Sequence, residues 1–153
     1  MIYRRADDYD NAMAHLSKGL ELARENDDKH GVADALYHMG SVAWSQGENL
    51  QATEYHREAY DIIRELNLTD IVAVQAIHGW AEAIWVSGYP EQAYILFEES
   101  LGLARQIGDK SYEAENLQMM AFMCTGTIGV ADFTRSLDLA EQSLAISQSA
   151  HMD

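Results

Sequence analysis

Residues 45–55 read SQGENLQATEY, and residues 86–96 read VSGYPEQAYIL. The two stretches share a glycine, a glutamine and an alanine in the same order, and each shared residue recurs 41 positions later. The pairs are Gly47 and Gly88, Gln51 and Gln92, and Ala52 and Ala93. Recurrence at one fixed distance indicates a chain that repeats a single structural unit.

The repetition extends beyond these two stretches. A short segment that ends in arginine recurs at offsets of 40 and 41, and a largely polar break follows each copy. The copies are Leu22-Ala23-Arg24, Ile62-Ile63-Arg64 and Leu103-Ala104-Arg105. Near the C-terminus the offset grows to 43, and the extra residues fall at 125–130. The chain therefore holds about three units, the last with a lengthened turn.

Each unit contains two helical patterns, because apolar and small residues recur every three or four positions. The first helices carry such stripes at Val32, Leu36, Met39, Gly40 and Ala43, at Val72, Ala76, Ile77, Trp80, Ala81 and Ile84, and at Ala114, Leu117, Met120, Ala121 and Cys124. The second helices carry them at Ala52, Tyr55, Ala59, Ile62, Ile63 and Leu66, and at Ala93, Leu96, Phe97, Ser100, Leu101, Ala104 and Ile107. A further second-type helix, over about residues 8–26, precedes the first pair. The patterns predict an all-α fold of about seven helices.

Turn and cap residues support these boundaries. Asp70 and Ser111 are expected to cap helix N-termini, since their side-chain oxygens can accept hydrogen bonds from unpaired amides. Pro90 is the only proline and lies where a first helical turn begins, the helical position that best tolerates proline. Gly47 and Gly88 are expected to end the preceding helices in the left-handed conformation.

Composition limits the classes of partner. The 153 residues include 25 acidic and 10 basic side chains, for a formal net charge of −15. Such a charge repels nucleic acid and anionic lipid and favours basic partners. The lone Cys124 is expected in the core, excludes an intramolecular disulfide and fits a reducing compartment. The first residues, MIYRRADDYDNA, contain no apolar run, so we expect neither a signal peptide nor a membrane span and place the protein in the cytoplasm.

The repeated positions resemble the tetratricopeptide repeat in a longer version of about 40 residues per unit. The residues that carry the resemblance are Met39-Gly40, Gly47, Ala52 and Ala59 in one unit, Trp80-Ala81, Gly88, Ala93, Phe97 and Ser100 in the next, and Met120-Ala121 in the third, where Ser136 replaces the small alanine. The resemblance implies an α-solenoid of stacked antiparallel helix pairs. Longer repeats of this kind occur in bacterial signalling and transcription regulators and in cargo adaptors.

On this reading the chain is one repeat domain. Residues 8–28 form a lone second-type helix, and residues 29–69, 70–109 and 110–150 form three helix pairs. Because the chain starts on a second-type helix, its end has apolar residues to cover, and homodimerisation through the terminal helices is an open alternative.

The resemblance also implies a binding surface, since the first helices of such proteins line a concave groove. Helical spacing places eleven residues on that face: Asp34, Tyr37, Ser41 and Trp44, then Gln75, His78, Glu82 and Trp85, then Glu115, Gln118 and Phe122. Aromatic rings beside carboxylates suit the basic and apolar side chains of a peptide or helix from a partner protein. The tryptophans also fit a plain packing role. Some family members grip a chaperone's terminal carboxylate on this face, and the acidic residues here exclude that ligand.

The histidines do not indicate catalysis. His30, Asp34 and His38 recur every four residues, which suits a metal, but no fourth ligand lies nearby in the sequence. His78 and Glu82 are spaced like an acid–base pair, but the spacing favours a hydrogen-bonded surface pair. Exposed positions are expected for His15, His56 and His151. We expect no cofactor, no metal and no enzymatic activity.

The leading functional hypothesis is therefore a protein-interaction scaffold that binds a peptide or helix of a partner in its groove. Two alternatives stay open. One is a self-assembly element, and the other is a domain that senses a peptide or other ligand within a larger signalling or transcription regulator.

Overall fold

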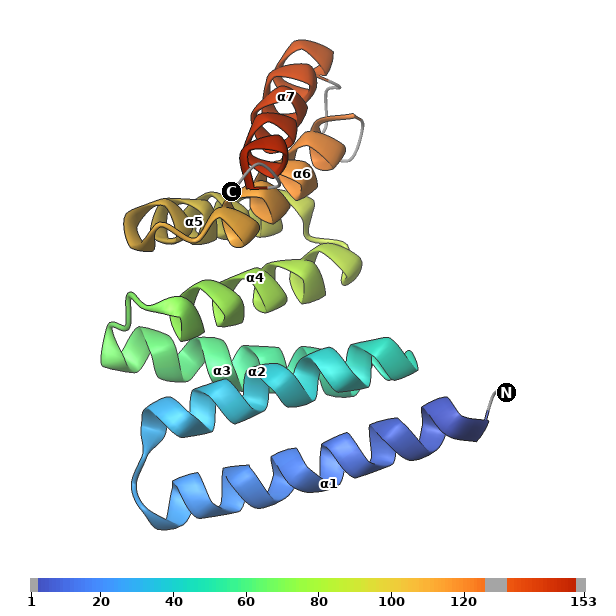
Figure 1. Ribbon diagram of the computed structural model, residues 1–153, viewed down its shortest axis with the longest axis vertical. Helices are drawn as coiled ribbons and strands as arrows, with labels where there is room; N and C mark the ends of the chain where they lie inside the picture. Colours follow the sequence, from blue (N-terminus) through green and yellow to red (C-terminus); the bar gives the residue numbers. More distant parts are fainter. Residues whose placement is uncertain (1–2, 126–131, 151–153) are drawn as a thin grey trace. The chain divides into compact units, whose positions relative to one another are not determined.

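A computed structural model describes residues 3–125 and 132–150 (Figure 1). Within these ranges the backbone forms seven α-helices and no strand, so the predicted all-α class is confirmed. The helices fall into two compact units, Met1–Leu68 and Thr69–Asp153. Unit 1 contains α1 (Tyr3–Glu25), α2 (Lys29–Gln46) and α3 (Asn49–Leu66); unit 2 contains α4 (Ile71–Val86), α5 (Pro90–Ile107), α6 (Lys110–Cys124) and α7 (Phe133–Ala150).

In unit 1, α2 packs against both α1 and α3 (Figure 1). The predicted stripe of α2 is buried in full, and Leu36 at its centre is inaccessible to solvent. Ala52 and Ala59 of α3 are also fully buried. Their methyl side chains are small, so the backbones of α2 and α3 can approach closely at these positions. Burial of a leucine side chain contributes about 1.5–3 kcal/mol, so this seam is a main source of the unit's stability.

In unit 2 each helix packs against the next one in sequence, and α4 also contacts α6. The core is built around Phe97 of α5, with Ile77 of α4 and Leu117 of α6 buried to the same degree. These three residues come from the predicted stripes of three different helices. The α-solenoid pattern of successive helix pairs is therefore present in unit 2, while the assignment of the whole chain to one domain stays a prediction.

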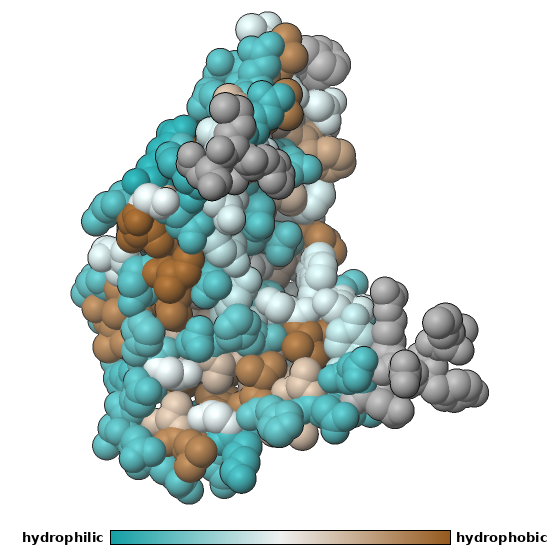
Figure 2. Space-filling view, in the orientation of Figure 1, coloured by the Kyte–Doolittle hydropathy of each residue, from teal (hydrophilic) through white to brown (hydrophobic). Residues whose placement is uncertain are grey.

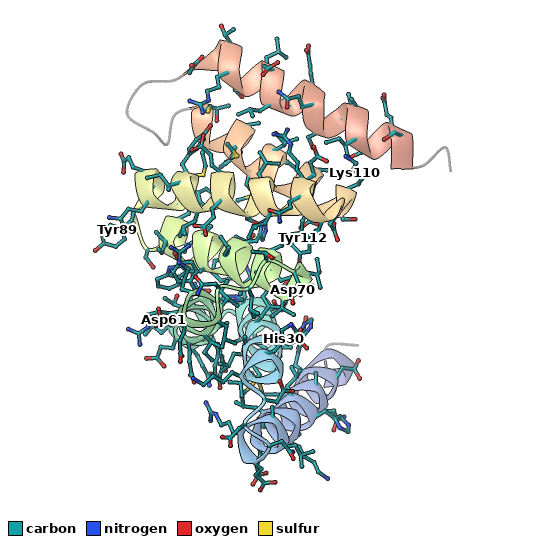
Figure 3. The ribbon with its side chains drawn as sticks, turned by 90° about the vertical axis from the view of Figure 1, so that its left-hand side faces the viewer. His30, Asp61, Asp70, Tyr89, Lys110 and Tyr112 are labelled. Atoms are coloured by element: carbon teal, nitrogen blue, oxygen red, sulfur yellow. The ribbon has the colours of Figure 1, made fainter. Side chains whose placement is uncertain are left out.

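Most of the predicted turn chemistry is confirmed. Gly47 and Gly88 adopt φ values of 81° and 92°, a region that a side chain makes costly. Asp70 caps α4, and its Oδ1 accepts hydrogen bonds from the amides of Val72 and Ala73. Pro90 lies in the first turn of α5. Figure 3 shows Asp70 ahead of α4 and Tyr89 at the turn that leads into α5.

Two predicted helix starts are wrong. The cap of α6 is Asp109, whose Oδ1 accepts from the Tyr112 amide at 2.9 Å, and not Ser111, which lies inside the helix. The first helix begins at Tyr3, five residues before the predicted start. Residues 1–18 contain neither glycine nor proline, so no helix-breaking residue prevents the helix from starting before residue 8.

The exposed position predicted for His56 is also wrong. His56 is buried, and its ring lies against Gly40 of α2. It falls between Ala52 and Ala59, so it shares their buried face on α3. His15 is exposed as predicted, whereas His151 and most of the lengthened turn at 125–130 lie outside the described residues.

One face of the described structure is largely hydrophilic (Figure 2). Figure 2 shows hydrophilic residues over much of one face, with smaller hydrophobic patches between them. None of the helices in residues 3–125 and 132–150 combines the length and hydropathy that crossing a bilayer requires.

Candidate functional site

Two helices of unit 2 bring most of the predicted groove residues together. The surface they form, here called the α4–α6 face, consists of Gln75, Glu82 and Trp85 on α4 with Glu115, Gln118 and Phe122 on α6. Glu115, Gln118 and Phe122 are exposed, and the three α4 residues are half-buried. These six residues keep solvent access while their neighbours form the core, and their role in binding stays a prediction.

An aromatic pair lies at one end of the α4–α6 face. The rings of Trp85 and Phe122 contact edge to face, with centroids 5.6 Å apart and planes at 77°. Phe122 keeps 56% of its surface exposed, whereas buried Met123 and Cys124 follow it on the core side of α6. An exposed phenylalanine supported by a tryptophan is a rigid apolar surface of the kind that anchors interfaces.

Two carboxylates precede this pair on the same two helices. Glu82 is three residues before Trp85, and Glu115 is seven residues before Phe122, so each shares a helix face with its aromatic partner. Burial raises the pKa of the Glu82 carboxyl above its usual value; His78 opposes this rise, and Glu115 adds to it. The two acids are thus close enough to interact, and the face combines apolar rings with concentrated negative charge.

His78 occupies a different place from the other predicted residues. It is buried, and its ring lies edge-on to Phe97 at 5.4 Å and to Tyr112 at 5.5 Å. Its Nδ1 lies 3.1 Å from Oδ1 of Asn116, and its Nε2 lies 3.7 Å from Oε1 of Glu82. His78 therefore connects the core with the α4–α6 face and exposes little surface of its own.

Asn116 is a residue that the sequence analysis missed. It is fully buried on α6, where its Nδ2 donates to Ser100 Oγ at 3.0 Å and to the Tyr112 carbonyl at 2.7 Å. Ser100 Oγ in turn donates to the Val74 carbonyl at 3.1 Å. The signal was present in the sequence, since Asn116 lies one residue before Leu117 and four before Met120, on the apolar stripe of α6.

The remaining predicted residues lie on α2 in unit 1. Asp34, Tyr37, Ser41 and Trp44 are all half-buried. Ser41 Oγ donates to the Tyr37 carbonyl at 3.1 Å, and the Tyr37 ring lies 5.8 Å from that of His56. Asp34 lies 3.5 Å from His38 Nε2. Part of this set is thus engaged inside its own unit, and the role of all four in binding stays a prediction.

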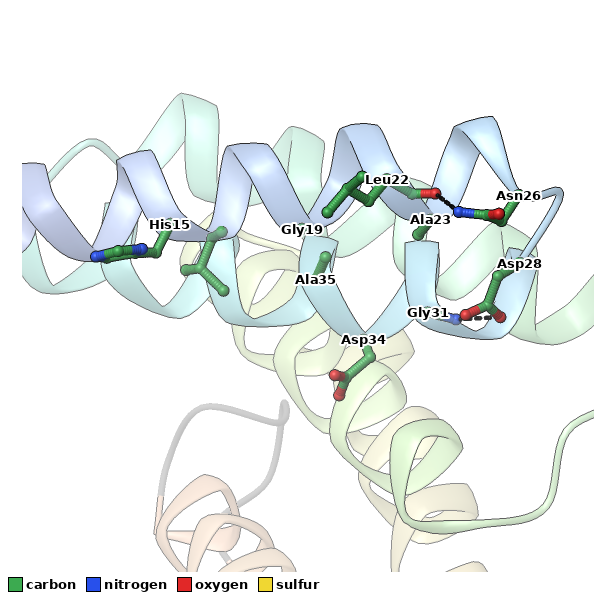
Figure 4. A pocket seen from close by; sticks show the side chains of 10 residues that line it. His15, Gly19, Leu22, Ala23, Asn26, Asp28, Gly31, Asp34 and Ala35 are labelled. Atoms are coloured by element: carbon green, nitrogen blue, oxygen red, sulfur yellow. Dashed lines mark hydrogen bonds between the residues drawn. The ribbon is translucent and has the colours of Figure 1, made fainter.

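A shallow recess of about 430 Å³ lies between α1 and α2 and includes Asp34 in its lining (Figure 4). Gly19 and Ala23 of α1 face Gly31 and Ala35 of α2 across it, so its walls are low. The Gly31 amide donates a hydrogen bond to Asp28 Oδ1 at 2.9 Å. Asp28 is therefore the N-cap of α2, and its carboxylate is already engaged. The recess offers little chemistry for a specific ligand.

The histidine spacing on α2 does not assemble a metal site. Within residues 8–125 and the described part of α7, no three His, Cys, Asp or Glu side chains lie close enough together to hold a metal ion. His38 and Asp34 are half-exposed and pair with each other. The buried side-chain amide of Asn116 in unit 2 is satisfied by protein groups.

Comparison with known proteins confirms the resemblance found in the sequence. Residues 1–65, about two-fifths of the chain, match the family model described as tetratricopeptide repeat. The matched residues span α1, α2 and nearly all of α3, the helices of unit 1.

Two proteins of Bacillus subtilis (strain 168) are similar to the chain. It is 26% identical to response regulator aspartate phosphatase J over 134 residues, 87% of this chain and 35% of that protein. It is 23% identical to response regulator aspartate phosphatase A over 103 residues, 67% of this chain and 27% of that protein. The chain thus spans about a third or less of the length of these relatives. Together the comparisons support a role in protein–protein interaction.

Proposed function

We propose, on the premise that this chain is built from tetratricopeptide repeats, that it is an interaction module whose first helices bind a peptide or helix of a partner protein. The observation that carries the proposal is the α4–α6 face, where exposed Phe122 contacts Trp85 and the same two helices carry the interacting carboxylates Glu82 and Glu115. The predicted residues of α2 in unit 1 are a second proposed binding surface, considered separately from the α4–α6 face.

The chemistry of the α4–α6 face favours a partner segment with an arginine or lysine next to a large apolar residue. Aromatic rings attract cations through their faces, and carboxylates pair with guanidinium and ammonium groups. Both kinds of group occur together on this face, at Trp85 and Phe122 and at Glu82 and Glu115. The net charge of −15 adds a long-range attraction for basic segments.

An array of short peptides tests this proposal. Folded wild-type protein should retain peptides in which arginine or lysine adjoins an apolar residue. Phe122→Ala should lose them, since removal of an interface aromatic costs about 2 kcal/mol or more, roughly thirtyfold in affinity. Ile95→Ala is the matched control, because Ile95 is an equally exposed apolar residue on α5, outside the face. Equal binding by wild type and Phe122→Ala would refute the proposal.

The two relatives indicate which partners to examine first. Both are named as phosphatases of response regulators, so we propose that this chain binds a response regulator or a peptide that controls such binding. We further propose that the chain binds without catalysing phosphate release. Purified response regulators, phosphorylated on aspartate, should bind the chain and keep their phosphoryl group; release above the spontaneous rate would overturn the non-catalytic part.

Self-assembly is the second candidate, and α7 carries the observation that favours it. Leu137 and Leu144 are 62% and 57% exposed and lie two turns apart on one side of α7. A second copy could bury both leucines. Light scattering across a hundredfold concentration range should then show a dimer that Leu137→Lys abolishes, with Leu50→Lys on α3 as the control at another exposed leucine. A monomer at every concentration would exclude this candidate.

A further inference from the structure

The position of one proton in unit 2 follows from the hydrogen bonds of Asn116. Both hydrogens of its Nδ2 are used, one towards Ser100 Oγ and the other towards the Tyr112 carbonyl. A carbonyl oxygen only accepts, so the amide cannot be turned round, and Oδ1 must be the atom that faces His78. Oδ1 also only accepts. His78 Nδ1, at 3.1 Å, therefore carries a hydrogen and donates it.

The imidazole of His78 consequently gains or loses its second proton at Nε2 alone. That atom faces Oε1 of Glu82 at 3.7 Å. The ring cannot rotate away, because Phe97 and Tyr112 hold it on two sides and Asn116 holds Nδ1. When Nε2 lacks a proton, its lone pair faces the carboxylate; one proton, on Nε2 or on Glu82, removes this repulsion.

The surrounding charges determine what can replace that proton. On α4, the titratable groups at this point are His78 and Glu82; α6 contributes Glu115 and the phenol of Tyr112. From α5, the groups that meet His78 and its hydrogen-bond partner are the Phe97 ring and the Ser100 hydroxyl, and neither titrates at ordinary pH. With one proton held by His78 and Glu82, the group carries a formal charge of −1. Without it the charge is −2, and the attraction for a cation is stronger.

We propose that the α4–α6 face binds a guanidinium or ammonium side chain at Glu82 and Glu115 in exchange for the proton held by His78 and Glu82, so that peptide binding releases a proton. The inference rests on the proposed function and identifies His78 as the residue that couples ligand binding to pH. Burial raises the pKa of Glu82, His78 opposes this rise, and Glu115 adds to it, so the carboxyl is sensitive to charges brought to this face.

The probe is N-acetyl-leucyl-arginyl-phenylalanine amide, whose only charge is the guanidinium. Its comparator carries citrulline, the neutral isostere of arginine. Dissociation constants would be measured from pH 5 to pH 8.5 by following the indole N–H resonances of the protein. While one proton is displaced per ligand, affinity for the arginine peptide should rise by up to about tenfold per pH unit. The citrulline peptide should bind more weakly and with no such slope.

The His78→Gln variant distinguishes the effect of the His78 proton from the effect of its packing and its hydrogen bond to Asn116. A glutamine amide can still donate to Asn116 Oδ1, but it does not titrate. At pH 8 this variant should bind the arginine peptide within about threefold of wild type, and its pH slope should be largely lost. His38→Gln is the matched control, because His38 also pairs with a carboxylate four residues earlier, but on the exposed surface of unit 1. It should keep the wild-type slope. Glu82→Gln is a second test of the same step and should lose both the slope and the preference for arginine over citrulline.

The outcomes distinguish this inference from the proposed function. A steep slope in wild type that His78→Gln removes supports the inference. Preference for the arginine peptide with one dissociation constant at every pH overturns it and leaves the proposed function in place. Persistence of the slope in His78→Gln, or in Glu82→Gln, also overturns it. Failure of both peptides to bind at any pH counts against the proposed function, and the inference falls with it.

Discussion

The imidazole of His56 occupies the space that a side chain at Gly40 would need: a Cβ built on Gly40 would lie 2.5 Å from Cε1 of His56 and within 2.8 Å of both ring nitrogens. The glycine on α2 and the histidine on α3 therefore form one close contact, and each requires the other's identity. Real Cβ atoms do not approach a ring this closely.

We expect Gly40→Ala to destabilise unit 1 by about 1–3 kcal/mol, because the added methyl forces a buried ring to move. Gly19→Ala is the matched control. Gly19 is helical, and nothing lies within 4 Å of a Cβ there, so alanine should stabilise by roughly 0.5–1 kcal/mol. Urea unfolding measures both. The double variant Gly40→Ala/His56→Ala should lose less stability than the sum of the two single variants, and simple additivity would show that the contact is not the cause.

Glu113 should make the stability of unit 2 depend on pH. Its side chain is 8% exposed and pairs with Arg105 at 2.9 Å and Lys110 at 2.6 Å. Burial alone would raise its pKa, but the hydrogen bonds and charges of Lys110 and Arg105 outweigh burial and lower the pKa below 4.5. A lowered folded pKa means that the contribution is present above the unfolded pKa and is lost as pH falls through the folded value.

The corresponding variant is Glu113→Gln, which we expect to cost roughly 1–3 kcal/mol at pH 7. The difference from wild type should shrink below pH 4.5, once the glutamate is protonated too. Glu98→Gln is the control, since the Glu98–Arg135 pair is half-exposed on both sides and such pairs contribute about 0–1 kcal/mol. A constant difference from pH 7 to pH 3 would contradict this account of Glu113.

The cap of α6 gives a direct comparison between sequence and structure. Asp109→Ala should destabilise by about 1 kcal/mol, because the Tyr112 amide loses its acceptor. Ser111→Ala should change stability by less than about 0.5 kcal/mol, or raise it slightly, since Ser111 is an exposed position inside the helix. Thermal unfolding of the two variants measures both losses of stability. A larger loss for Ser111→Ala than for Asp109→Ala would identify Ser111 as the cap.

Ser100→Ala should also destabilise unit 2, by about 1–2 kcal/mol. It removes the acceptor of one Asn116 hydrogen and the donor to the Val74 carbonyl, both in a region without solvent access. The control is Ser147→Ala on α7, whose hydroxyl bonds only to the carbonyl four residues earlier. If the two substitutions have the same effect, the buried chain of hydrogen bonds does not stabilise the core.

Local sequence signals predicted most of the fold. The glycines at 47 and 88 and the proline at 90 act within one turn of their own position, so their spacing alone located the turns. The alanines at 52 and 93 marked close helix crossings for the same reason. Asp109 was missed although it stands immediately before α6, because Ser111 is an equally good cap by residue type and the choice depends on where the helical hydrogen bonds begin.

The interior polar residues were predicted less well, because their surroundings come from other helices. His56 fits Gly40, 16 residues away in sequence, and His78 bonds to Asn116, 38 residues away. No local sequence pattern shows that a histidine will contact a particular residue on a neighbouring helix. The register of Asn116 and Glu113 with Leu117 and Met120 was nevertheless a usable sign of burial. The binding roles of the eleven predicted surface residues depend on a ligand and stay predictions.

Packing between sequence neighbours also has a consequence for how the chain folds. Within each unit nearly all helix contacts join consecutive helices, so the chain segments closed by these contacts are short. Short loop closures cost little entropy, and relative contact order is low, which favours rapid folding that can begin at any helix pair. In unit 2, the backbone of α7 packs against α6 alone among the described helices, and its links to α5 are side-chain pairs such as Arg135–Glu98. The amides of α7 should therefore exchange with solvent through local opening well before those of α5.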